Sequence, residues 1–143
     1  MTRNSLTSGH FVAQVFSGTP PTCISPTTVC SRATFTGGIS GSLEGVLNRV
    51  VPADPPTVLL AEFSGVIHTK DGDLFFKDSG VANSSSSSDG EEVALLEFTG
   101  GTGKLSGASG YLQDHGTSTF TLFGSTVLRG DVQGDYVGSL VLP

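Results

Sequence analysis

The chain has 143 residues, of which 20 are Gly and only 14% are charged, and a chain of this length forms one compact domain. Its 7 Lys and Arg against 13 Asp and Glu give a formal net charge of -6. This acidic balance argues against nucleic-acid binding, which requires a basic surface, and against docking on anionic lipid. No apolar run approaches the roughly 20 residues of a membrane-spanning helix, so membrane insertion is not expected.

The first 30 residues are patterned less clearly than the rest. They begin without the apolar stretch of a signal peptide, which favours a cytoplasmic location. One strand is predicted over residues 10–17, followed by a Pro-rich loop that holds Cys23 and Cys30. The two cysteines form either a disulfide or two free thiols, depending on the compartment. A catalytic thiol, which needs an activating His nearby, is a weaker alternative.

The remainder of the chain predicts strands and turns. Short runs rich in Val, Ile, Thr, Phe and Leu alternate with Gly, Asp-Gly and Ser clusters, and no stretch has helical apolar spacing without a Gly or Pro break. Asp71-Gly72 predicts a tight hairpin, the Pro-rich residues 51–56 a loop, and the Ser-rich residues 83–92 a flexible hairpin tip. The predicted strands are 10–17, 32–40, 42–51, 57–69, 73–82, 91–99, 109–115, 118–124 and 126–142, the last bent or split.

Many glycines fall inside these predicted strands, where Gly normally weakens a sheet. Interior Gly is expected where strands coil or bulge to close a small barrel. Closure also removes edge strands, which a chain so poor in charge could not easily protect with lysines. We therefore predict one all-β domain over residues 1–143, a closed antiparallel β-barrel of about eight strands with a Gly-rich turn near one end.

That Gly-rich segment, residues 99–110, reads Thr-Gly-Gly-Thr-Gly-Lys-Leu-Ser-Gly-Ala-Ser-Gly. It lacks the ending of a phosphate-binding loop and the spacing of a dinucleotide motif, so phosphate binding is not expected. Its pattern resembles the turn shared by the allene oxide cyclase and dirigent-protein superfamily, which includes bacterial barrel proteins of unassigned function. Gly-punctuated segments at 35–45, 63–72 and 130–138 resemble the same superfamily, and the likeness runs from about residue 30 to the C-terminus. The resemblance implies that Leu105, where Phe is more usual, plugs one end of the barrel.

Period-2 alternation predicts which side chains face the barrel interior. Asp78 and Tyr136 are polar exceptions on mostly apolar faces, whereas Glu62 and Glu97 face outward unless the register differs by one residue, which would bury them and raise their pKa. Asp78 either caps a bulge or acts as an acid or base in the cavity. Tyr136 is either a core aromatic or a proton donor. The candidate catalytic residues are Asp78, Tyr136 and Glu62, and the predicted cavity-lining residues are Phe35, Phe63, Ile67, Phe76, Leu96, Phe98 and Leu140.

An eight-stranded barrel is either filled by side chains or holds one small ligand. The resemblance implies a cyclase or isomerase that folds a flexible apolar molecule, such as a polyketide, polyene or epoxide, for stereoselective ring closure. A non-catalytic carrier of an apolar metabolite is the alternative, and a filled barrel that only mediates interactions is a third. The resemblance implies no cofactor and a homo-oligomer, a dimer or trimer. His10, His68 and His115 lack metal-ligand spacing, so no metal is expected.

Overall fold

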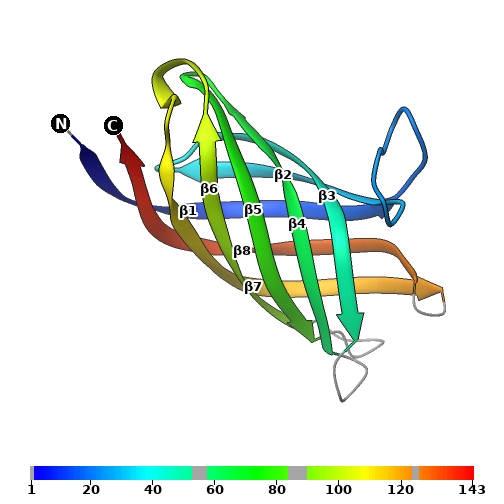
Figure 1. Cartoon of the computed structure of the whole chain (residues 1–143). Helices are drawn as coiled ribbons and strands as arrows, with labels where there is room; N and C mark the ends of the chain where they lie inside the picture. Colours follow the sequence, from blue (N-terminus) through cyan, green and yellow to red (C-terminus); the bar gives the residue numbers. More distant parts are fainter. Residues whose placement is uncertain (1, 53–57, 84–89, 124–125) are drawn as a thin grey trace.

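The computed structural model describes residues 2–52, 58–83, 90–123 and 126–143, and these residues form one closed antiparallel barrel (Figure 1). Each strand pairs with its neighbours in sequence, and β1 closes the barrel by pairing with β8. The predicted all-β barrel is therefore confirmed. The strands are β1 (Arg3–Ser17), β2 (Val29–Gly37), β3 (Gly41–Pro52), β4 (Val58–Thr69), β5 (Gly72–Asn83), β6 (Gly90–Gly101), β7 (Ser109–Phe123) and β8 (Thr126–Leu142).

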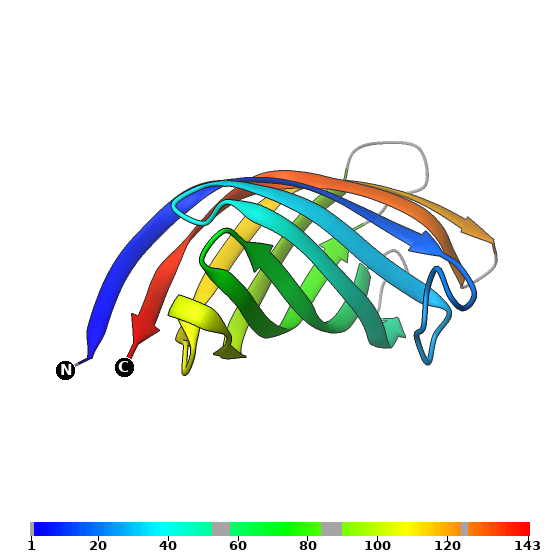
Figure 2. The same cartoon turned by 90° about the horizontal axis from the view of Figure 1, so that it is seen from above.

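The strand boundaries differ from the prediction mainly in β1, β2 and β7, whereas β8 spans the predicted residues 126–142 as one strand. Strand β1 begins at Arg3, because its first residues pair with the end of β8, and the two chain termini consequently lie close together (Figure 2). The predicted runs 109–115 and 118–124 are one strand, since Gly116 continues the ladder opposite Gly134. A Cβ atom on Gly116 would lie 1.9 Å from the carbonyl oxygen of Gln133, so this glycine permits a close strand approach and does not mark a turn.

One end of the barrel carries short connections and a filled core. The predicted hairpin at Asp71-Gly72 is confirmed, with Gly72 at a φ of 135°, which favours glycine. The Gly-rich segment forms one 3₁₀ turn, Gly103–Leu105, and the Leu105 side chain is buried in the core, as expected for a plug. The other buried residues that fill this end include Ile39, Ile67, Leu74, Phe98, Ala108 and Leu112.

The connection between β1 and β2, residues 18–28, lies at the opposite end and projects from it (Figure 1). Cys23 and Cys30 form a disulfide in this region, which resolves the two alternatives left open by the sequence. The hydroxyl groups of Ser25 and Thr27 both donate to the carbonyl oxygen of Leu47, at 2.9 and 2.7 Å. Leu47 adjoins a bulge in β3, so the disulfide-bonded loop is tied to the rim of the barrel.

Most of the predicted loop at 51–56 and of the predicted tip at 83–92 lies outside the described residues, although Val51, Pro52, Asn83 and Gly90 belong to strands. Within the part of the chain that is described, no helix has the length and apolar character needed to cross a membrane.

Candidate functional site

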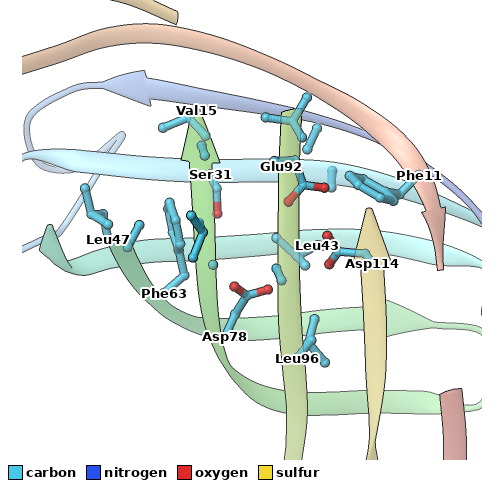
Figure 3. A pocket seen from close by; sticks show the side chains of 18 of the residues that line it. Phe11, Val15, Ser31, Leu43, Leu47, Phe63, Asp78, Glu92, Leu96 and Asp114 are labelled. Carbon is cyan, nitrogen blue, oxygen red and sulfur yellow. The ribbon is translucent and has the colours of Figure 1, made fainter. Parts of the chain in front are cut away.

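The barrel encloses a cavity of about 140 Å³, to which all eight strands contribute side chains (Figure 3). Apolar side chains make up most of its wall. It lies between the filled end described above and a small cluster of Val15, Val29 and Leu47 near the opposite end. The polar side chains in its lining are Ser31, Asp78, Glu92 and Asp114.

The three carboxyl groups come from adjacent strands. Asp78 lies on β5, Glu92 on β6 and Asp114 on β7. Side chains two residues apart on a strand point to the same face, and each of the three carboxyl groups shares the inward face with such neighbours. In the register, Ala94 of β6 lies between Gly80 and Asp114. Such small residues leave space in front of the carboxyl groups, and Figure 3 shows all three groups directed into the cavity.

Burial in this apolar cavity changes the ionisation of all three groups. Desolvation, with the charge of Glu92 as a second cause, raises the pKa of Asp78 to about 7. Burial also raises the pKa of Asp114 well above its ordinary value, with a hydrogen bond to Glu92 and the charges of Glu92 and Asp78 acting in the same direction. Burial raises the pKa of Glu92, while Asp114 and His115 oppose that change. At neutral pH, therefore, Asp114 and Glu92 hold a proton between them and Asp78 titrates.

A buried hydroxyl lies on the inner face of the same strand as Asp114, outside the cavity lining. Ser118 is only 1% exposed, and alternation along β7 places it on the same inner face as Asp114 and the cavity-lining Phe120. Its Oγ atom makes no hydrogen bond within the described residues, and the same is true of Glu92 Oε1. Two buried polar atoms on this side of the barrel thus lack partners among the described residues, and such atoms are uncommon in folded proteins.

The candidate catalytic residues occupy three different places. Asp78 faces the cavity, as alternation predicts. Glu62 is exposed on the outer face of β4, where it pairs in register with Arg49, because the adjacent Phe63 points into the cavity. The one-residue shift that would bury Glu62 and Glu97 does not occur, and Glu97 instead forms an exposed ion pair with Lys77 at 3.4 Å. Glu62 therefore does not join Asp78 in a common site.

Tyr136 is buried in the core but is not part of the cavity lining. Its hydroxyl accepts a hydrogen bond from the backbone nitrogen of Ile39 at 2.9 Å and lies 2.8 Å from the carbonyl oxygen of Thr36. Its ring packs on Phe35 at the filled end of the barrel. This is the placement expected of a core aromatic residue, the first of the two alternatives for Tyr136.

The structure places the predicted lining residues in two regions. Phe35, Phe63, Phe76 and Leu96 line the cavity. Ile67, Phe98 and Leu140 do not, because they pack in or against the core that fills the end near the Gly-rich turn.

Sequence reasoning missed Glu92 and Asp114. The alternation that places Leu96 and Ala94 inward continues to Glu92, but the Ser-rich stretch before it led to an interpretation of this region as a hairpin tip. The buried Leu112 in the same way predicts an inward Asp114 two residues later. Both carboxyl groups could have been found by extending each strand pattern by one period.

Among the described residues, no group of three or more His, Cys, Asp or Glu is arranged to hold a metal ion. Comparison of the chain with protein-family models, curated proteins and solved structures finds no match. The cavity and its carboxyl groups are therefore the features of the molecule that indicate a function.

Proposed function

We propose that the protein is a cofactor-independent cyclase or isomerase that acts on a flexible, largely apolar small molecule inside the barrel. The observation that carries this proposal is the position of Asp78, a carboxyl group with a pKa of about 7 in the wall of an apolar cavity. A group whose pKa is close to the working pH can both accept and return a proton. Apolar cavities with a few placed polar groups are the usual sites for small molecules.

The apolar wall supplies the conformational restraint that ring closure requires. The rings of Phe11, Phe35, Phe63 and Phe76 all border the cavity, and they bury hydrocarbon while limiting the conformers that the ligand can adopt. Holding a flexible chain close to its reactive geometry removes part of the entropic barrier. An apolar cavity of about 150 Å³ holds benzene, so a cavity of about 140 Å³ encloses a ring-sized part of a molecule.

The carboxyl groups supply proton transfer. In its ionised form, Asp78 removes a proton from one position of the ligand and returns it at another, so the product has the same atoms as the substrate. The proton held between Asp114 and Glu92 is available to a polar atom of the ligand at which charge develops. No redox step is needed for such an isomerisation.

The test is to incubate the purified protein with an organic extract of its source organism and to compare mass spectra before and after. We expect one metabolite to be replaced by an isomer of equal mass, and Asp78→Asn to slow this conversion at least about 100-fold. Asp73→Asn, the same substitution at a half-buried position of β5 outside the cavity, should keep the rate. A compound retained unchanged would instead identify a carrier, and a protein that neither converts nor retains any compound would refute both functions.

The homo-oligomer implied by the resemblance is part of the proposal. Three exposed apolar residues, Leu60, Val81 and Val93, lie in register across the outer faces of β4, β5 and β6, which is compatible with contact between copies. Light scattering of the purified protein should give the mass of a dimer or trimer, and Val81→Asp should lower it. A monomeric mass would refute this part.

A further inference from the structure

The polar part of the cavity lies on one side. Asp78, Glu92 and Asp114 come from β5, β6 and β7. The opposite strands β1 to β4 contribute apolar side chains and one hydroxyl, that of Ser31, and β8 contributes Val132. A ligand in the cavity therefore meets carboxyl groups along one wall and hydrocarbon along the other.

No basic side chain balances these carboxyl groups. The described residues that line the cavity include no Lys, Arg or His, and His115 is exposed on the outer face of β7. Tyr136 of β8 lies opposite Asp114 in the register, but its hydroxyl is bound to the backbone of the β2–β3 connection. Buried carboxyl groups are normally paired with a cation or fully hydrogen-bonded. Here the described lining supplies no cation, and the charge of His115 acts on Glu92 only from the outer face.

One carboxyl oxygen of the cavity wall, a hydrogen-bond acceptor, lacks a partner. Glu92 Oε1 makes no hydrogen bond within the described residues. The hydroxyl of the buried Ser118, which can both donate and accept, is also unpartnered but is not part of the cavity lining. Glu92 is flanked in the register by two small inward-facing residues, Ala82 and Gly116, which leave room beside its carboxyl group. The missing complement is therefore a compact group that donates hydrogen bonds and carries positive charge.

We propose that the ligand of this cavity carries a basic amine, and that its ammonium group binds between Glu92 and Asp114 with the apolar body against the aromatic wall. The inference rests on the proposed function in that it uses the same cavity and leaves Asp78 as the proton-transferring residue. The ammonium group enters charged and takes the place of the proton held between Asp114 and Glu92, which leaves to solvent, so the net charge of the site is unchanged. For such a ligand the ammonium N–H groups replace that proton as the hydrogen-bond donors at this wall. A ligand with a carboxylate or phosphate at this position is disfavoured, because the ionised carboxyl groups of this wall repel its negative charge.

Three probes of nearly equal size test the charge preference. Benzylamine, benzyl alcohol and benzoate each present one ring and one polar group, and at neutral pH they are cationic, neutral and anionic. Isothermal titration calorimetry with the wild-type protein should show benzylamine binding at least tenfold more tightly than benzyl alcohol, with benzoate the weakest. In two buffers of different ionisation heat, benzylamine should release a proton on binding and benzyl alcohol should not.

Matched variants show which carboxyl groups cause the preference for benzylamine. Glu92→Gln and Asp114→Asn should each reduce the preference for benzylamine over benzyl alcohol at least about fivefold. Glu91→Gln, the same substitution at the neighbouring exposed position of β6, should leave it unchanged. The comparison of the three probes uses the wild-type protein alone, so it decides the question even if a variant fails to fold.

The possible outcomes separate this inference from the proposed function. Equal binding of the three probes, tighter binding of benzyl alcohol or benzoate, or no binding of any probe overturns the amine inference. If one of these results accompanies conversion of a metabolite in the extract, the isomerase proposal stands without it. If benzylamine is preferred as expected but the wild-type protein converts nothing, the cavity is an amine-binding site and the isomerase proposal falls.

Discussion

The hydroxyl of Tyr136 binds both backbone groups of Ile39. It lies 2.9 Å from the Ile39 nitrogen, from which it accepts a hydrogen bond, and 2.9 Å from the Ile39 carbonyl oxygen. The same hydroxyl lies 2.8 Å from the Thr36 carbonyl oxygen, so its single proton is shared between two acceptors. This one side chain ties β8 to the connection between β2 and β3, which closes the filled end of the barrel.

The first prediction concerns this contact. Tyr136→Phe removes the hydroxyl and leaves the buried backbone groups of Ile39 without their partner, which should lower the free energy of unfolding by about 1–3 kcal/mol in urea denaturation. Tyr111→Phe is the matched control, since Tyr111 is 44% exposed, and it should change stability little. If Tyr136→Phe keeps its stability but abolishes metabolite conversion, the hydroxyl acts in catalysis and its structural role is refuted.

The barrel itself could be predicted because its signals are local. Alternating β-branched and aromatic residues mark strands, and glycines inside the strands indicate tight closure. The extra strand boundary predicted between residues 115 and 118 arose because Gly116 was interpreted as part of a turn. In the barrel this glycine faces the backbone of β8 at close range, and a sequence does not distinguish a glycine that turns from one that lets two strands approach.

The site could be predicted only in part, because alternation along one strand reveals which residues face inward but not how far each lies from the filled end. Asp78 and Phe98 are both on inward faces, yet one lines the cavity and the other packs into the core. The three carboxyl groups meet because β5, β6 and β7 are neighbours with a particular register. That register depends on contacts across the whole barrel, which no single strand pattern contains.

The second prediction follows from the raised pKa of Asp78. Its value changes from the ordinary 3.8 to about 7 in the folded protein, so the folded state binds this proton more tightly than the unfolded state does. The contribution of Asp78 to stability is therefore most favourable below about pH 4 and is lost as the pH rises towards and beyond 7. The side chain of Asp78→Asn cannot ionise, so the variant does not lose stability in this way. Its free energy of unfolding at pH 8 should exceed that of the wild-type protein by at most about 4 kcal/mol.

Urea denaturation of the wild-type protein and of Asp78→Asn at pH 5 and pH 8 measures this effect. The gain should be larger at pH 8 than at pH 5, because Asp78 is ionised in the folded state only at the higher pH. Asp131→Asn, at an exposed position, provides the reference for loss of a surface carboxylate. A gain that is equal at both pH values would contradict the assignment of the titration to Asp78.

The third prediction concerns the disulfide-bonded loop between β1 and β2. The disulfide between Cys23 and Cys30 closes a short segment, and cross-linking a segment of this length restricts the unfolded chain by roughly 2.5 kcal/mol in the chain-entropy model. The double substitution of both cysteines by Ser should lower the free energy of unfolding by about that amount. In the wild-type protein, thiol titration under denaturing conditions should detect no free thiol until a reductant is added, and reactive thiols without reductant would contradict the disulfide.

The fourth prediction concerns His68 on the outer face of the barrel. Its Nε2 atom lies 3.0 Å from Glu44 Oε2 and its Nδ1 atom 2.9 Å from Asp73 Oδ1. Both ring nitrogens can donate at once only when the imidazole is protonated. The hydrogen bond to Glu44, followed by that to Asp73, raises the pKa of His68 above the ordinary value of 6.5.

Because the folded-state pKa is raised, the stabilisation from His68 is fully present below pH 6.5 and is lost as the pH rises through the higher folded value. The side chain is 44% exposed, so solvent screening keeps this contribution below about 1 kcal/mol. An NMR titration of the His68 ring should give a midpoint above 6.5, and Glu44→Gln and Asp73→Asn should each lower it. A midpoint at or below 6.5 in the wild-type protein would show that the two carboxylates do not hold the ring in solution.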